Sequence, residues 1–372
     1  MIGRKAKYFQ KRKNRNKRII SLILILVVLA IGSVFLIQFL NRNENHPNLT
    51  EDEKKGIELI PEYSTWMVDW DWNSAFNEGE KLVGNIKSYQ LFASYFNDNG
   101  ELYMQEKFKE MFSKIKESEA FAESNLFLTI VNDRIFVDGT SIQKDPTLIS
   151  QHVSSKASRE KHINDIMNLL EEYQLPGVEI DYEKIDDKDW ENTIKFFTEL
   201  QERLKESGRS LRIVLESNAP IERLEFPDGP EYIMMAYNLY GTHSGPGPKA
   251  DFELIESVAK KLKNLPGDGI IAIALGGFDW EENGKVVSVT EERAEDLLKL
   301  SSSGEVRDHE SGSLSFQYVD DEGKNHIVWY ADAKTLEGWM NTSMESGISK
   351  FALWRLGGVT NSTIEFLSQK RD

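Results

Sequence analysis

The chain has 372 residues, of which 40% are hydrophobic and 28% charged, a composition that allows a sizeable core and excludes wholesale disorder. It contains no cysteine, which excludes a disulfide framework and a thiolate metal site. Residues 1–18 hold nine Lys and Arg and no acid, and the rest of the chain carries 61 Asp and Glu against 36 Lys and Arg. A body that acidic repels nucleic acid, so a neutral or cationic substrate suits it better.

An uncharged stretch of mostly Ile, Leu and Val follows the basic tail and spans residues 19–40. At about 1.5 Å per residue, a helix of this length crosses the hydrocarbon core of a bilayer. Because the basic residues come first, the positive-inside rule keeps them in the cytoplasm and sends the rest of the chain outside. The alternative is a cleaved signal peptide, but its apolar region is normally only about 7–15 residues. We therefore expect a single-pass membrane anchor, then a polar stalk over 41–59, on a bacterial cell surface.

From residue 60 onward, short apolar runs alternate with amphipathic segments. The runs are continuous rather than alternating, which is typical of parallel strands buried on both faces. The helical segments place their apolar residues on one face, as at 163–173 and 190–204. The predicted strands are Thr65–Asp69, Ser88–Tyr95, Leu126–Val131, Gly177–Asp181, Leu211–Glu216, Tyr232–Tyr237, Ile270–Leu275 and Lys350–Trp354. Strand–helix alternation over eight strands predicts an α/β fold, a (β/α)8 TIM barrel over 60–372.

The interval between the seventh and eighth predicted strands is too long for a simple connection. It contains two alternating runs, Ser313–Val319 and His326–Tyr330, on either side of a turn that includes Gly323. This pattern predicts a β-hairpin. Because an insertion at this point leaves the barrel at its C-terminal face, we expect it to wall a substrate groove.

Three acids stand at alternate positions of the fourth predicted strand and the loop after it: Glu179, Asp181 and Glu183. Side chains two apart on a strand point to the same face. Three carboxylates inside a barrel repel one another and lack water, which raises at least one pKa and supplies a proton donor near neutral pH. An exposed acidic strand is the structural alternative. Because barrel strands are covered on both faces, we expect a functional cluster.

The segment Pro176–Glu183 resembles the DGxDxDxE signature of glycoside hydrolase family 18, the chitinase-like family, on its fourth barrel strand. Gly177, Asp181 and Glu183 match, whereas Pro176 and Glu179 stand where the family has Asp. Three later segments resemble the ends of strands six, seven and eight, in the family's order: Met235–Asn238, Ala274–Trp280 and Leu353–Gly358. The strand-seven segment and the hairpin resemble the branch of bacterial cell-wall and spore-lytic N-acetylglucosaminidases.

The resemblance implies a substrate-assisted retaining mechanism without a protein nucleophile. Glu183 would protonate the leaving oxygen and later act as base toward water, while the substrate's acetamido carbonyl attacks the anomeric carbon. Asp181 would orient the acetamido N–H and Tyr237 would bind its carbonyl. The residues that we expect to bind or line the substrate are Glu179, Asn238, Trp354, Met235, Trp70 and Asp69. Core packing is the alternative for Tyr237 and Trp354, and a solvated loop is the alternative for Asp69 and Trp70.

No phosphate-binding loop, dinucleotide fingerprint, serine-hydrolase elbow or paired histidine motif is present, so we expect neither a cofactor nor a metal. The expected partner is an N-acetylhexosamine-containing polysaccharide. The first hypothesis is a hydrolase of β-1,4-linked N-acetylglucosamine glycans: peptidoglycan, chitin-type oligomers or an exopolysaccharide. The alternatives are a catalytically silent, lectin-like glycan-binding barrel and an accessory protein of polysaccharide synthesis or export. Glu183 favours the enzyme, because lectin-like members usually lose this residue.

Overall fold

The structure is a computed structural model that describes residues 59–369. The predicted basic tail and membrane anchor lie outside the described residues, as does the stalk up to residue 58. Within 59–369, no helix is both long enough and apolar enough to cross a membrane.

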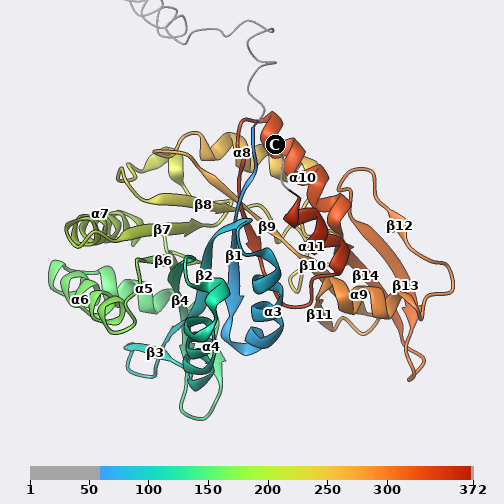
Figure 1. The fold of residues 1–372 in the computed structure, drawn as a ribbon, viewed down its shortest axis with the longest axis horizontal. Helices are drawn as coiled ribbons and strands as arrows, with labels where there is room; N and C mark the ends of the chain where they lie inside the picture. Colours follow the sequence, from blue (N-terminus) through green and yellow to red (C-terminus); the bar gives the residue numbers. More distant parts are fainter. Residues whose placement is uncertain (1–58, 370–372) are drawn as a thin grey trace, which may run out of the picture. The chain divides into compact units, whose positions relative to one another are not determined.

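Eight parallel strands pair in a closed ring, with the last strand hydrogen-bonded to the first (Figure 1). In ring order they are β1 (Glu62–Val68), β2 (Ile86–Phe96), β4 (Asn125–Ile135), β6 (Gly177–Asp181), β7 (Ser210–Leu215), β8 (Glu231–Met235), β9 (Ile270–Ala274) and β15 (Lys350–Trp354). Each of the eight predicted strands overlaps one of these. The predicted TIM barrel is confirmed.

Helices surround the strands and cover them from outside (Figure 1). They are α3 (Trp72–Leu82), α4 (Glu106–Glu117), α5 (Pro146–Val153), α6 (Lys156–Glu172), α7 (Trp190–Glu206), α8 (Phe252–Leu262), α10 (Ala333–Glu345) and α11 (Asn361–Ser368). The predicted apolar faces pack inward: Ile163 and Leu170 of α6, and Phe197 and Leu204 of α7, are buried. Single-turn 3-10 helices, η1 (Asp69–Asp71), η2 (Glu119–Phe121) and η3 (Ile221–Arg223), and two short strands, β3 (Leu102–Met104) and β5 (Ser141–Ile142), lie in the connections.

The insertion after β9 forms an antiparallel sheet of its own, in the order β11-β10-β14-β13-β12. Its elements are β10 (Gly276–Glu281), β11 (Val286–Val289), α9 (Glu291–Leu298), β12 (Val306–Arg307), β13 (Leu314–Val319) and β14 (Asn325–Ala331). The β13–β14 pair confirms the predicted hairpin, whereas β10, β11 and β12 were not predicted. Gly277 lets β10 lie against β14, because a Cβ there would come within 1.8 Å of the Trp329 carbonyl oxygen.

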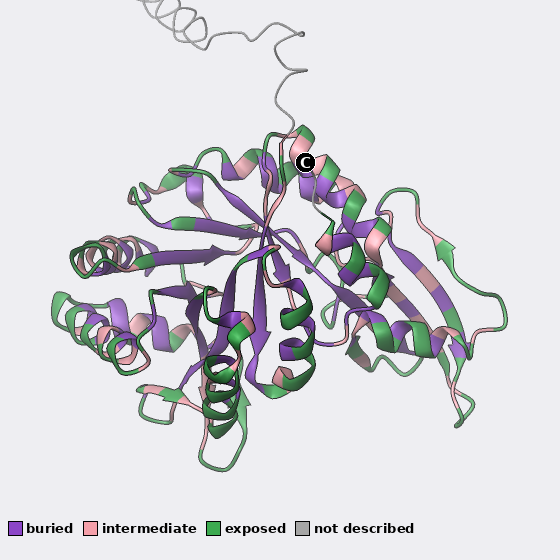
Figure 2. Ribbon diagram, in the orientation of Figure 1, coloured by how far each residue is buried: buried purple, intermediate pink, exposed green. Residues whose placement is uncertain are grey.

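The apolar core lies on both sides of the barrel wall. Figure 2 shows the barrel strands as almost continuously buried, which explains why their sequences do not alternate. One cluster packs between the strands and the outer helices, and a second fills the barrel interior. The interior cluster includes Trp66, Phe92, Val131, Ile233 and Met235, with Tyr237 and Trp354 partly buried beside it. Buried polar side chains, including Glu179 and Arg212, fill the interior together with this cluster.

Candidate active site

The residues predicted to carry chemistry gather where the barrel strands end. Asp181 is the last residue of β6, and Glu183 stands two residues further on. Tyr237 follows β8, and Trp354 is the last residue of β15. The carboxyl ends of parallel barrel strands lie at one face, so these side chains meet at the barrel mouth.

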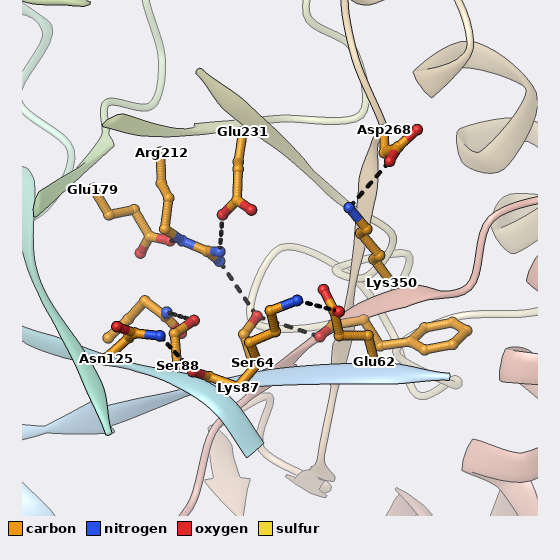
Figure 3. Close-up of polar contacts among 12 residues, drawn as sticks. Glu62, Ser64, Lys87, Ser88, Asn125, Glu179, Arg212, Glu231, Asp268 and Lys350 are labelled. Atoms are coloured by element: carbon orange, nitrogen blue, oxygen red, sulfur yellow. Dashed lines mark hydrogen bonds and ion pairs between the residues drawn. The ribbon is translucent and has the colours of Figure 1, made fainter. Parts of the chain in front are cut away.

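The lowest acid, Glu179, is fully buried and ion-paired with Arg212. Its carboxylate accepts hydrogen bonds from Trp66 Nε1 at 2.6 Å, Thr129 Oγ1 at 2.9 Å and Arg212 Nε at 2.9 Å. Figure 3 shows the Arg212 guanidinium between Glu179 and Glu231. Glu179 adds to the charge repulsion on Asp181, as predicted, but its own charge is balanced by Arg212. With no exposed surface, Glu179 supports the strand from inside the barrel.

Asp181, two residues closer to the barrel mouth than Glu179, has a pKa that burial raises strongly. Its side chain is almost fully enclosed, and its Oδ1 has no hydrogen-bond partner among residues 59–369. Burial raises the pKa of Asp181 well above its ordinary value; Lys144 opposes this, and Glu183, Glu179 and Asp133 add to it. The geometry thus favours a proton held on or near Asp181, next to the carboxyl of Glu183.

Glu183 contacts a lysine that the sequence did not suggest. Lys144 Nζ lies 2.7 Å from Glu183 Oε1, 3.8 Å from Asp181 Oδ2 and 4.0 Å from Asp133 Oδ1. Burial lowers the pKa of Lys144, but the three carboxylates outweigh burial and the net direction is upward. Lys144 therefore remains charged and offsets the repulsion among these acids.

The loop that carries Lys144 is fastened to the strand that carries Glu183. The Asn132 side chain donates to the carbonyls of Glu183 and Asp145 and accepts from the Glu183 N–H at 3.0 Å. Asp145 caps helix α5, with Pro146 in its first turn, and also pairs with Arg134 at 2.9 Å. Because Asp145 follows Lys144 directly, these contacts fix the position of the ammonium group relative to Glu183.

Backbone strain also gathers at the barrel mouth. Lys144, Lys184 and Asn238 have positive φ angles of 56°, 55° and 68°, a region that non-glycine residues rarely enter. The Lys184 N–H donates to Glu216 Oε2 at 2.8 Å, which holds the turn after Glu183. Such strained positions persist where the surrounding structure fixes them, and they cluster at functional sites.

The residues from β8 and β15 complete the mouth. Burial, and then the acids Asp181, Glu183 and Glu179, raise the pKa of Tyr237 well above 10, so its hydroxyl keeps its proton. Trp354 packs edge-on against Trp66 and Phe92, with ring centroids 5.6 and 5.0 Å apart.

Met235 lies buried beneath Tyr237 and Trp354 as part of the interior cluster. Asn238 is exposed at the rim. The structure thus brings Asp181, Glu183, Tyr237 and Trp354 to one mouth, while Met235 supports them from below.

Asp69 and Trp70, the two site residues predicted at the end of β1, differ in their exposure. Asp69 is fully buried and accepts a hydrogen bond from the Tyr95 hydroxyl at 2.8 Å, so the expectation that it lines an open groove was wrong. Trp70 is 47% exposed and packs edge-on against Phe92, which leaves its indole available to a ligand. Burial raises the pKa of Asp69, with the Tyr95 hydrogen bond opposing it.

The two cations that pair with the acids of the fourth barrel strand and its loop were missed at the sequence level. The sequence could have indicated Arg212, since it is the only charged residue within the predicted strand interior Leu211–Leu215, and a buried charge implies a partner of opposite charge. The sequence gives no such indication for Lys144, because it stands in a polar loop. No group of three or more potential metal-binding side chains was found between residues 59 and 369.

A closed parallel barrel with a pair of carboxyls at its C-terminal mouth, one buried and one partly exposed, and an aromatic side chain beside them fits a glycoside hydrolase. The family model for glycosyl hydrolases family 18 matches residues 89–358, and the chain belongs to that family.

Relatives and solved structures agree with this assignment. The chain is 21% identical over 329 residues to the glycosylase YvbX of Bacillus subtilis, covering 84% of this chain and 91% of YvbX. It is 23% identical to a cortical fragment-lytic enzyme of Bacillus anthracis, covering 54% of this chain and 50% of that enzyme.

Among solved structures, the spore cortex-lytic enzyme SleL of Bacillus cereus aligns with a TM-score of 0.70 at 18% identity, over 85% of this chain and 77% of SleL. A chitinase of Chromobacterium violaceum aligns with a TM-score of 0.71 at 15% identity, over 83% of this chain and 98% of the chitinase. At these identities the likeness shows the fold.

Proposed function

We propose that this protein hydrolyses β-1,4-linked N-acetylglucosamine-containing glycans by a substrate-assisted, retaining mechanism. The observation that carries the proposal is the Asp181–Glu183 pair: two neighbouring carboxyls, one deeply buried and one at the mouth, beside a protonated tyrosine. Family membership and the fold shared with chitinases and cortex-lytic enzymes support the same chemistry.

Each step has a group in place to perform it. Glu183 gives its proton to the glycosidic oxygen, and the bond from that oxygen to the anomeric carbon breaks. The acetamido carbonyl oxygen of the substrate forms the new bond to the same carbon, which gives a cyclic oxazolinium ion. With the proton of the carboxyl pair on Glu183, Asp181 is the carboxylate that accepts from the acetamido N–H and offsets its developing positive charge, while the Tyr237 hydroxyl donates to the carbonyl oxygen. Water then opens the ring as Glu183 takes the proton back.

The Asp181–Glu183 pair suits the substrate-assisted mechanism. The usual retaining scheme needs a carboxylate nucleophile about 5–5.5 Å from the acid, on the far side of the sugar. Here Glu179 is committed to Arg212, Trp66 and Thr129. Glu179 is thus not free to act as that nucleophile, and membership of family 18 assigns the role to the substrate's own acetamido group.

The membrane anchor predicted over 19–40 would hold this barrel outside the cell, beside the wall or capsule. This placement rests on the apolar stretch and on the basic residues before it. The cell-wall relatives named above are consistent with a glycan of the cell envelope as substrate, with peptidoglycan as the first choice.

The direct test is hydrolysis of N-acetylglucosamine oligomers and peptidoglycan by the full-length chain in detergent, with Glu183→Gln alongside. We expect the variant to lower kcat/KM by about 10²–10⁴-fold, the usual range for a general acid–base group. Glu253→Gln, an exposed change in the first turn of α8, is the matched control. Glycan binding without hydrolysis by the wild type would instead identify a lectin-like barrel.

A further inference from the structure

A second lysine at the barrel mouth stands in a cationic environment. Lys249, in the loop between β8 and α8, donates from Nζ to the Leu275 carbonyl at 3.0 Å and lies over the Phe278 ring at 4.9 Å. Among residues 59–369 no carboxylate lies within ion-pairing distance of it. Burial, and then the nearby Arg355, lower the pKa of Lys249 to about 7. The part of the chain that the structure describes thus supplies no counter-charge for this ammonium group.

Lys249 lines a cavity of about 40 Å³ that Trp354 and Arg355 also line. One water needs roughly 10–15 Å³ of such space, so the cavity has room for a small group of several atoms. Gly276, Gly357 and Gly358 form part of the lining, at positions where a Cβ would come within 2.4–2.6 Å of a neighbouring atom. The cavity thus adjoins the aromatic floor of the candidate active site and is walled by two cationic side chains.

The acids close to this cavity are already engaged. Asp71 accepts from Arg355 Nη1 at 2.8 Å. Glu291 also lines the cavity, but its two oxygens accept hydrogen bonds from the N–H and hydroxyl of Thr360 and from the hydroxyl of Thr363. Burial raises the pKa of Glu291. Neither carboxylate therefore neutralises Lys249.

We propose that this cavity is a subsite for a carboxylate carried by the glycan substrate, with Lys249 as its ion partner and Arg355 as a second donor. A carboxylate on the sugar next to an N-acetylglucosamine unit, such as the lactyl group of a muramic acid, has the size and charge that the cavity accommodates. The inference rests on the proposed function and narrows it to acidic N-acetylglucosamine glycans.

The subsite refines the expectation drawn from overall charge. The net charge of −16 disfavours an anionic polymer at long range, but salt screens interactions between exposed charges beyond about 8–10 Å. Within the cavity, a carboxylate would favour the charged form of the partly buried Lys249 and would form a charge-assisted hydrogen bond with it. The contacts with Lys249 and Arg355 would therefore bind a carboxylate even though the net charge of the protein does not attract anions.

The test compares one glycan in two charge states. Peptidoglycan strands freed of their stem peptides carry a lactyl carboxylate on each muramic acid, and carbodiimide activation followed by reduction converts it to a neutral alcohol. For the full-length wild type we expect kcat/KM to be about tenfold higher on the carboxylate strands, mainly through KM. Lys249→Gln keeps a donor for Leu275 but loses the charge, so the ratio should fall to near one, while Lys249→Arg should keep most of it.

The ratio is the readout, so a general loss of activity in a variant does not obscure it. Lys260→Gln, an exposed change on α8, removes the same charge away from the cavity and should leave the ratio at its wild-type value. A wild-type ratio near one, or an unchanged ratio in Lys249→Gln, would overturn the carboxylate subsite while hydrolysis itself stands. If the wild type cuts neither strand nor neutral N-acetylglucosamine oligomers, the proposed function fails and the subsite with it.

Discussion

The barrel mouth has an acidic wall, where Lys144 meets the carboxylates of Asp133, Asp181 and Glu183, and a cationic wall, where Lys249 meets none. The first wall is carried by β4, β6 and the loop before α5. The second is carried by the β8–α8 loop, β9 and β15, and in the ring of strands only β7 separates β6 of the first wall from β8. Both lysines are largely enclosed.

The two walls differ in whether the chain provides carboxylates for the buried lysine, and this difference gives the two lysines different roles. A buried cation with built-in carboxylates stabilises and orients those carboxylates, so Lys144 belongs to the catalytic machinery of the chain itself. A buried cation without nearby carboxylates lacks a counter-charge, and an anionic ligand can supply one. The partners of each lysine therefore indicate its role: Lys144 positions the catalytic acids, and Lys249 is available to bind a ligand.

The largest expected effect comes from the ion pair beneath the acidic wall. Arg212→Met leaves Glu179 buried without its counter-charge and should lower the free energy of unfolding by about 3–5 kcal/mol. Denaturant unfolding measures this change. Glu231→Gln removes the other partner of Arg212, whose side chain is 46% exposed, and should cost under about 1 kcal/mol. If Arg212→Met were as mild as Glu231→Gln, the acids of this wall would not depend on built-in cations.

A smaller effect comes from two histidines behind the same wall. The rings of His152 and His162 stack at 4.3 Å, and His162 Nε2 lies 2.6 Å from the hydroxyl of Tyr182, between Asp181 and Glu183 in the chain. Burial lowers the pKa of His152 to about 4 and that of His162 well below 6.5. The folded state therefore holds both rings neutral, whereas the unfolded chain protonates them below pH about 6.5.

Stability from His152 is thus fully present above pH 6.5 and is lost progressively as pH falls from 6.5 to 4, by about 3 kcal/mol in all. The free energy of unfolding should drop over this window by less in His152→Gln than in the wild type. The difference between the two proteins isolates the histidine from the titrating carboxyls. Parallel pH profiles would show that His152 does not contribute.

The smallest expected effect concerns Lys144 itself. Lys144→Met removes the cation that lowers the pKa of Asp181, while Glu183, Glu179, Asp133 and Tyr237 still face that carboxyl. Asp181 should therefore keep its proton to higher pH, and the alkaline limb of the kcat/KM profile, which depends on the proton of the Asp181–Glu183 pair, should move upward. At pH 7 we expect a loss of about tenfold from poorer positioning, with Lys144→Arg closer to wild type. An unmoved alkaline limb would reduce Lys144 to a packing role.

Much of the fold could be predicted because barrel strands carry a distinct pattern. Continuous apolar runs such as 270–275 occur only where both faces are covered, and the hairpin at 313–330 alternates because one face is open. Strand β10 was missed because Gly276 and Gly277 interrupt its apolar pattern, although they are what permits its close approach to β14.

The candidate site was predictable only in part, for a physical reason. Asp181 and Glu183 are neighbours in sequence, so their shared face follows from strand geometry. The contacts of Lys144 with Glu183 and of Arg212 with Glu179 join residues 39 and 33 positions apart. Such contacts depend on how loops close and how strands stagger, which no local pattern contains.

The most direct test of the substrate-assisted mechanism is the configuration of the first product. Proton NMR during hydrolysis of an N-acetylglucosamine pentamer by the full-length chain would report the anomer released before mutarotation. Because the acetamido group and then water attack the same carbon, the mechanism predicts an initial excess of the β anomer. An initial excess of the α anomer would show inversion and would contradict the roles assigned to Asp181 and Glu183.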